Sequence, residues 1–384
     1  MLLLGSTTLA YRQVIWLGGP RVIATGVEYY TSTDRTLVEP AAPIAVFMLK
    51  LDPRRARLDS ALSNDEVMGA ETVDALATRR QALAAVNGGF FNTRTGEPVS
   101  LLKVAGVIVS DNPATKGAVV IQSPPRGRTE LLFDQIAVRV TLKFRALGRD
   151  YVVPIDGVDT TRERGKLMLF TPLYHADTDT ALNGTEWTLD GKPLKVKDVR
   201  PNMGHTPIPR TGAVLSYGGI ALPDALAVLA PGVPVAFEPA WKTLNGLNAK
   251  ELDRADAIVN GAGLLRLRGK TPINWESGES LNPGNFINMR HPRTMIGVDR
   301  HGFIWLAAVD GRQPEYSVGM TFADLGRLCD RLELTGALNL DGGGSTTMAM
   351  EDPMTGARSI VNTSSDNPQG RVVATSLAVF ATRR

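Results

Sequence analysis

Residues 302–345 read GFIWLAAVDGRQPEYSVGMTFADLGRLCDRLELTGALNLDGGGS, and this stretch decides how the C-terminal half is expected to fold. Two apolar runs, Phe303–Val309 and Ala337–Leu340, each end in an Asp-Gly pair. Between them, apolar residues recur at helical spacing after Thr321, a residue type that caps helix N-termini, and Gly336 is expected to end the helix. The stretch therefore predicts a strand, a helix and a second strand.

A strand–helix–strand unit of this length makes its two strands parallel and connects them by a right-handed crossover. Asp310 and Asp341 then leave the sheet at one edge, the carboxyl edge at which open α/β sheets bind ligands. Strands that are neighbours or one apart place the two carboxylates about 5 to 10 Å apart. Glycoside hydrolysis uses two carboxylates at such separations, one to protonate the leaving oxygen and one to attack or to activate water. One Asp-Gly pair is more often only a turn, so it is the presence of two that favours a site.

Small residues follow Asp341, namely Gly342, Gly343, Gly344, Ser345 and Thr346. Glycines allow a ligand to approach the backbone closely, and successive backbone amides can bind an anion. The spacing matches neither a dinucleotide fingerprint nor a nucleotide-phosphate loop, and no lysine follows. We therefore treat all five residues as candidate substrate contacts.

Other candidate site residues lie outside this stretch. Asn87, Gly88 and Gly89 follow an expected strand, and they are equally compatible with a hairpin turn and with a site. Three arginines are expected near this edge, Arg290, Arg293 and Arg312. The hydroxyl residue Thr294 is adjacent to Arg293 and is a further candidate. A guanidinium group offers a planar fork of donors that suits a phosphate, although a single arginine is more often only a solvated surface group.

The composition excludes several classes of function. The chain has 384 residues, a net charge of +3 and 21% charged residues, without the dense basic run that nucleic-acid binding needs. Its single cysteine, Cys329, cannot form an internal disulfide or a cysteine-based metal site. The four histidines show no metal-ligand spacing, so no metal-ligating residues are predicted.

The pattern along the chain predicts an α+β fold of mixed β-sheets flanked by helices, with the C-terminal βαβ unit carrying the site at its strand carboxyl ends. Residues 1–40 are expected to form an N-terminal strand region, and residues 41–384 the main domain, in which 130–240 is a β-rich part or insertion. The apolar start, Met1–Ala10, is too short to span a membrane and is read as a possible remnant of a signal peptide. Residues 274–288 are predicted to be a surface loop.

Taken together, the motifs resemble those of the phosphodiester glycosidase family. The segments that carry the resemblance are Asn87–Phe91, Arg293–Gly297, Asp310–Arg312 and Leu338–Thr346. The resemblance implies hydrolysis of the glycosidic bond between a sugar, with N-acetylglucosamine as the candidate, and a phosphodiester. It implies an envelope polysaccharide or glycoconjugate as substrate and a secreted or cell-envelope location. It gives no oligomeric state.

Under this hypothesis Asp310 and Asp341 supply the carboxylate chemistry, with their two roles not yet divided. Arg293, Arg312 and the glycine amides hold the phosphate, and Asn87 orients sugar hydroxyls. No cofactor is expected, although a carboxylate at a glycine-rich turn also suits Ca²⁺ or Mg²⁺ near Asp341. Two alternatives remain open: a glycoside hydrolase acting on a neutral glycan, and a non-catalytic carbohydrate-binding envelope protein.

Overall fold

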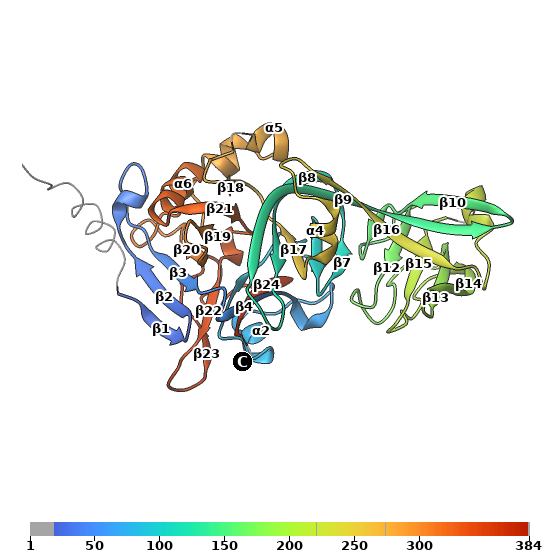
Figure 1. Ribbon diagram of the computed structural model, residues 1–384, viewed down its shortest axis with the longest axis horizontal. Helices are drawn as coiled ribbons and strands as arrows, with labels where there is room; N and C mark the ends of the chain where they lie inside the picture. The colour runs from blue at the N-terminus through green and yellow to red at the C-terminus, as the bar shows by residue number, and fades with distance from the viewer. Residues whose placement is uncertain (1–18, 220, 273, 383–384) are drawn as a thin grey trace, which may run out of the picture.

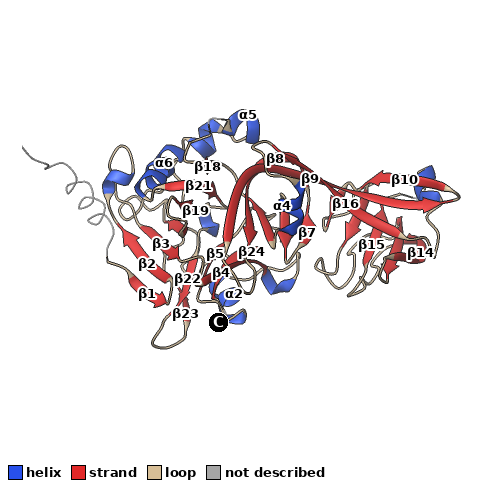
Figure 2. Cartoon of the chain, in the orientation of Figure 1, coloured by secondary structure: helices blue, strands red, loops and turns tan. Residues whose placement is uncertain are grey.

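A computed structural model describes residues 19–219, 221–272 and 274–382 of the chain, and within them most of the regular structure is β-sheet (Figures 1 and 2). The α-helices are α2 (Val73–Arg79), α3 (Asp224–Ala227), α4 (Ala249–Arg254), α5 (Trp275–Glu279) and α6 (Phe322–Arg331). Turns of 3₁₀-helix cover Arg35–Leu37, Ser63–Asp65 and Gly343–Ser345, and a π-helical turn covers Pro283–Ile287. The fold is therefore one of mixed sheets and helices, as predicted.

The first sheet contains the strands that lead to the two aspartates. Its spatial order is β1 (Arg21–Ala24), β2 (Val27–Ser32), β3 (Val46–Leu51), β20 (Ile304–Val309), β19 (Arg293–Asp299), β21 (Leu334–Asn339) and β18 (Leu264–Arg266). Strand β19 lies between β20 and β21 and is antiparallel to both, so those two run in the same direction one strand apart. Asp310 and Asp341 therefore leave the sheet at the edge where β19 begins with Arg293.

Helix α6 connects β20 to β21 and packs on this sheet. Thr321 caps it as predicted, with its side chain accepting from the Asp324 amide and the Asp324 side chain accepting in return. The predicted end of the helix at Gly336 was wrong. Glu333 ends the helix in the left-handed conformation (φ 54°), and Gly336 lies inside β21, where a Cβ would overlap the ring of Phe133.

Two further sheets complete the body. One has the order β23 (Arg358–Ile360), β22 (Met348–Glu351), β5 (Ala84–Asn87), β24 (Thr375–Ala381) and β4 (Ala56–Leu62). The other has the order β10 (Arg149–Pro154), β9 (Glu130–Ala146), β8 (Asn112–Gln122), β17 (Ala257–Asn260), β6 (Leu102–Val104) and β7 (Val107–Ser110), and β16 (Val235–Thr243) also pairs with β9. One apolar core joins side chains from all three body sheets, which fixes the strand ends relative to one another.

A second lobe projects from the body on the long strands β9 and β16, which lie antiparallel (Figure 1). Between them the chain forms a five-stranded sheet in the order β11 (Gly157–Val158), β12 (Leu167–Phe170), β15 (Ala213–Tyr217), β13 (Gly184–Asp190) and β14 (Lys195–Met203). The lobe has its own apolar core, in which Trp187 is fully buried. It falls within residues 130–240.

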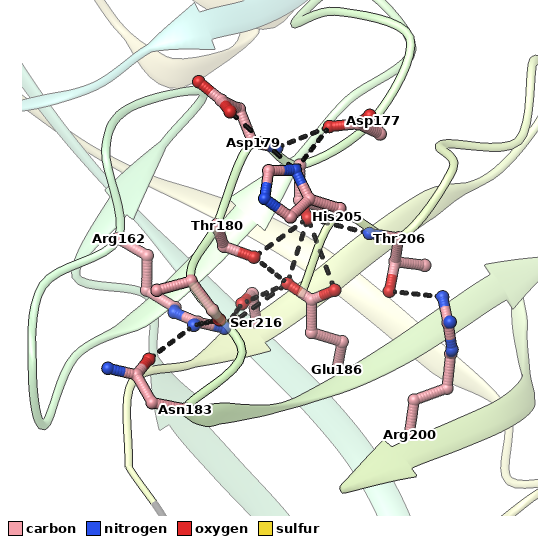
Figure 3. Close-up of polar contacts among 12 residues, drawn as sticks. Arg162, Asp177, Asp179, Thr180, Asn183, Glu186, Arg200, His205, Thr206 and Ser216 are labelled. Atoms are coloured by element: carbon pink, nitrogen blue, oxygen red, sulfur yellow. Dashed lines mark hydrogen bonds and ion pairs between the residues drawn. The ribbon is translucent and has the colours of Figure 1, made fainter. Parts of the chain in front are cut away.

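A buried carboxylate also organises the lobe (Figure 3). Glu186 is fully buried and accepts hydrogen bonds from the hydroxyls of Thr180 and Ser216, both at 2.7 Å. Arg162 lies 3.4 Å from the same carboxylate and also donates to the Ser216 hydroxyl. Because the group is paired and hydrogen-bonded, its burial is tolerated and the surrounding loops are held in place.

The N-terminal strands are part of the same architecture. Strands β1 and β2 lie in one sheet with β3, so the boundary expected at residue 40 falls between strands of one sheet. The apolar start, Met1–Ala10, lies outside the described residues. No helix in the described part of the chain is long and apolar enough to cross a membrane.

The surface loop predicted at residues 274–288 was wrong, because the segment holds α5 and the turn Pro283–Ile287. Its anchor is Glu279, which is fully buried and accepts from the backbone amides of Gly117, Gly263 and Leu264 at 2.9 to 3.0 Å. A buried acceptor of this kind is invisible in a sequence window rich in Asn, Gly and Ser.

Candidate active site

The turn after β21 is fixed to two other strands of the body. The Asp341 amide donates to the Gly88 carbonyl at 3.2 Å, and the Gly343 amide donates to the Pro292 carbonyl at 3.0 Å. The Asp341 carbonyl accepts from Nδ2 of Asn87 at 2.8 Å. The backbone of the turn is therefore held between the end of β5 and the start of β19.

Asn87 is the centre of this arrangement. It is 1% exposed, and its Oδ1 accepts from the Thr294 hydroxyl at 2.6 Å and from the Thr347 amide at 3.1 Å. Since its Nδ2 donates to the Asp341 carbonyl, both ends of the amide are engaged by the protein. Asn87 and Thr294 are thus placed to position the Asp341 turn.

The glycines after Asn87 allow close packing. A Cβ on Gly88 would overlap the Thr375 hydroxyl of β24, and one on Gly89 would lie 2.9 Å from the carbonyl of Asn260 in β17. The segment is therefore not a hairpin turn. It brings the end of β5 against two neighbouring strands, a contact that requires residues without side chains.

The Asp341 carboxylate lies at the start of the glycine turn. It is partly buried, and burial raises its pKa to about 6, while Ser345, the Gly342 amide and Arg371 lower it to a smaller extent. Its Oδ1 accepts from the Gly342 amide at 2.8 Å. A carboxyl group that titrates near neutral pH suits general acid–base chemistry.

Asp310, by contrast, is held by three donors. It is 1% exposed; its Oδ1 accepts from Nδ2 of Asn362 at 2.8 Å, and its Oδ2 accepts from the Thr363 amide at 2.8 Å and the Tyr316 hydroxyl at 3.1 Å. Burial raises the pKa of Asp310 above its usual value, and these hydrogen bonds only partly offset that rise. Asn362 also donates to the Thr346 carbonyl at 3.1 Å, so Asp310 and the glycine turn are connected through one side chain.

Arg293 is a buried cation beneath the site. Its guanidinium donates to three backbone carbonyls, those of Met320, Phe286 and Met289, at 2.6 to 3.1 Å. Burial, and to a smaller extent the nearby charge of Arg312, lowers its pKa to about 9. At neutral pH it remains charged, and it adds positive potential to a site in which another arginine is already close.

Arg312 lies over the glycine turn. Its Nη2 donates to Nδ1 of His291 at 3.4 Å, and its Nη1 lies 3.6 Å from Oδ1 of Asp366. A Cβ on Gly343 would lie 3.1 Å from Arg312 Nη2, and Gly343 has a φ of 61°. His291 Nε2 contacts the Asn285 carbonyl at 2.9 Å, which assigns the proton to Nε2. Burial lowers the His291 pKa, so the ring is neutral at pH 7.

A second exposed arginine lies beside the same turn. Arg371 forms an ion pair with Asp366, and a Cβ on Gly344 would overlap the Asp366 carboxylate and lie 2.8 Å from Arg371 Nη2. Arg371 also lowers the pKa of Asp341. The guanidinium groups of Arg312 and Arg371 and the carboxylate of Asp366 therefore lie next to Gly343 and Gly344. These glycines are close to Asp341, whose pKa is raised.

A sequence profile of the phosphodiester glycosidase family matches residues 183–380, which include all of these groups apart from the Asn87 segment. The chain belongs to the phosphodiester glycosidase family. No curated protein matches the sequence.

Solved structures share this fold. A hypothetical protein from Synechocystis aligns with a TM-score of 0.75 at 19% identity, covering 93% of this chain and 62% of that one. A Burkholderia pseudomallei protein, described as a putative exported protein, aligns with a TM-score of 0.70 at 24% identity, covering 88% and 74%. The catalytic domain of zebrafish N-acetylglucosamine-1-phosphodiester α-N-acetylglucosaminidase, auto-inhibited by its pro-peptide, aligns at 0.48 and 15% identity, covering 96% and 87%. This chain spans only about three fifths of the length of the Synechocystis protein.

The structure brings most of the predicted phosphodiester glycosidase residues together, but not the side chain of Arg290. Its Nη2 donates to the Pro40 carbonyl at 2.9 Å, and its Nε lies 3.8 Å from Asp324 at the start of α6. Both partners belong to the packing of α6 against the N-terminal segment. Arg290 therefore links α6 to the N-terminal segment, and its contacts with Pro40 and Asp324 do not involve the glycine turn.

The residues missed by sequence reasoning lie in the last loop before β24. Asn362 and Thr363 donate to Asp310, and Asp366 and Arg371 lie beside Gly344. Nothing in the local sequence says that this loop folds back across the ends of β20 and β21, so only the three-dimensional structure reveals it.

Two hydroxyls beside the turn have no hydrogen-bond partner. The side-chain oxygens of Thr346 and Thr347 are buried and make no hydrogen bond in the described structure. The Ser345 hydroxyl, by contrast, lowers the pKa of Asp341 through a side-chain hydrogen bond. Buried polar groups without partners are rare, and they are expected to pair with substrate or water.

Metal-ligating side chains do not gather at Asp341 in the described part of the chain. The group of three that does come together is Asp177, Asp179 and His205, whose ligand atoms lie within 4.8 Å of one another in the projecting lobe (Figure 3). Asp341 belongs to no such group among the described residues. A divalent cation there would have a single carboxylate and otherwise backbone or hydroxyl ligands.

Proposed function

We propose that this protein hydrolyses the glycosidic bond between a sugar and a phosphodiester, releasing the free sugar and a phosphomonoester. The observation that carries the proposal is that Arg312 lies next to Gly343 and Arg371 lies next to Gly344, directly beside Asp341. Guanidinium groups next to an acid that titrates near pH 6 suit a substrate with an anionic leaving group and a neutral reacting carbon.

In the proposed reaction the anionic form of Asp341 accepts a proton from water as the water oxygen attacks the anomeric carbon. The bond between that carbon and the bridging oxygen breaks, and its electrons remain on the phosphate. Because a phosphomonoester is a good leaving group, it needs charge stabilisation more than protonation, and Arg312 and Arg371 supply this. A pKa of about 6 leaves Asp341 ionised at pH 7 and basic enough to take a proton.

The two aspartates then have different roles. Asp310 has both carboxylate oxygens engaged by three donors, so it is proposed to position the turn through Asn362. Asn87, whose amide is fully engaged, positions the Asp341 backbone in place of the predicted contact with sugar hydroxyls. The free hydroxyls of Thr346 and Thr347 are better candidates for the sugar.

The substrate is proposed to be a phosphate-linked envelope polysaccharide or glycoconjugate, with N-acetylglucosamine as the first sugar to test. A secreted or envelope location accords with such a substrate, and one protein of the same fold is described as exported.

The test offers the purified protein a panel of sugar-1-phosphate methyl diesters, beginning with that of N-acetylglucosamine, together with neutral aryl glycosides. We expect free sugar from at least one diester and none from the aryl glycosides. Asp341→Asn should lower turnover about a hundredfold or more while the fold is retained. Release from the neutral glycosides alone would establish a conventional glycoside hydrolase instead.

A further inference from the structure

The loop residue Asp366 occupies an unusual place in the site, because it is the carboxylate shared by the two exposed arginines. Its Oδ1 lies 3.6 Å from Arg312 Nη1, and its Oδ2 pairs with Arg371. The side chains of all three are between 32% and 47% exposed, so they face solvent at the turn. Because they are partly exposed there, they can reach a ligand bound at the turn.

The charge of this group has a simple balance. Two guanidinium groups carry two positive charges and Asp366 carries one negative charge, which leaves one net positive charge beside Gly343 and Gly344. The neighbouring Arg293 and ionised Asp341 carry opposite charges that cancel. A phosphodiester carries a single negative charge, whereas a phosphomonoester, whose second pKa is about 6, carries close to two at pH 8. The cationic group is therefore matched in charge to the diester and under-charged for the monoester.

We propose that Asp366 is a specificity-determining residue that tunes this arginine pair to bind a phosphodiester substrate in preference to the phosphomonoester product. The proposal rests on the proposed function for its choice of ligands. Hydrolysis at the glycosidic bond would convert a monoanion into a dianion at the arginines. A fixed carboxylate beside them repels the added charge, which favours release of the product.

The test measures two dissociation constants by titration with inert probes, dimethyl phosphate for the diester and methyl phosphate for the monoester, at pH 8 and low salt. The readout is the ratio of the two constants. Loss of arginine positioning would weaken both probes, the dianionic methyl phosphate more, and so move the ratio toward dimethyl phosphate, whereas loss of the negative charge moves the ratio toward methyl phosphate. Asp366→Asn should shift the ratio about tenfold toward methyl phosphate, as expected for one charge a few ångströms away near a protein surface.

Two further variants complete the design. Asp366→Glu keeps the charge and should leave the ratio within about twofold of the wild-type value. Asp65 bridges Arg79 and Arg80 in the same way but has no recorded contact with the turn, so Asp65→Asn is the matched control. An unchanged ratio in Asp366→Asn, or no binding of either probe to the wild type, overturns the inference. Turnover of the diester panel is measured separately, so a protein that binds the probes with the expected ratios but hydrolyses no diester contradicts only the proposed function.

Discussion

Replacing Asn87 by alanine tests whether the site is built around this side chain. The substitution removes three hydrogen bonds, those to the Asp341 carbonyl, the Thr294 hydroxyl and the Thr347 amide. Each buried group left without a partner costs about 1 to 3 kcal/mol. Because the three losses share one cavity and do not add fully, we expect the free energy of unfolding to fall by about 3 to 6 kcal/mol.

The assay is urea unfolding followed by tryptophan fluorescence at fixed pH. Asn92→Ala is the matched control, since the Asn92 side chain makes an exposed hydrogen bond to the Arg94 amide at 3.0 Å, and it should cost no more than about 0.5 kcal/mol. The fall in Asn87→Ala should be accompanied by lower turnover at low denaturant, because the Asp341 turn loses an anchor. A loss of stability no larger than that of Asn92→Ala would refute the view that Asn87 organises the site.

Two other substitutions follow from buried and partly buried carboxylates. Because the pKa of Asp341 is raised from 3.8 to about 6 in the folded state, kcat/KM should rise with pH through an apparent pKa of about 6, and a flat profile between pH 5 and 7 would contradict the role of Asp341. The same shift means that folding binds a proton between these two values, so the wild type should lose stability relative to Asp341→Asn as pH rises from about 4 to 7; chemical unfolding across that range measures it. Glu279→Gln places an amide opposite three backbone N–H donors and should lower the free energy of unfolding by about 2 to 4 kcal/mol without moving the kinetic pKa. A shift in that pKa would show that α5 is coupled to the chemistry.

The sequence predicted the strands and the helix that lead to Asp310 and Asp341. Two buried strands that end in Asp-Gly and a capped helix between them are local patterns, and they place Asp310 and Asp341 at one sheet edge even though β19 lies between the strands. The helix end was misplaced, because a left-handed Glu333 ends it while Gly336 serves packing against Phe133. Gly336 was predicted to end the helix, but a glycine is needed there because the Phe133 ring, distant in the sequence, packs against it.

What the sequence could not predict depends on contacts between distant segments. The side-chain amide of Asn87 is hydrogen-bonded by residues 207 to 260 positions away in the sequence. Arg290 and Arg293 are three residues apart, but one pairs with α6 and the other stacks in an aromatic environment beneath the site. Asp366 carries no motif, and its place between two arginines follows only from the path of the last loop.

The most direct test of the central claim is the position of bond cleavage. Hydrolysis of a reactive sugar-1-phosphate methyl diester in ¹⁸O-labelled water, followed by mass spectrometry of both products, reports which bond receives the water oxygen. If Asp341 directs water to the anomeric carbon and the arginines hold the leaving phosphate, the label appears in the free sugar and is absent from the methyl phosphate. Label in the phosphorus-containing product would mean attack at phosphorus, and it would contradict this account of the site.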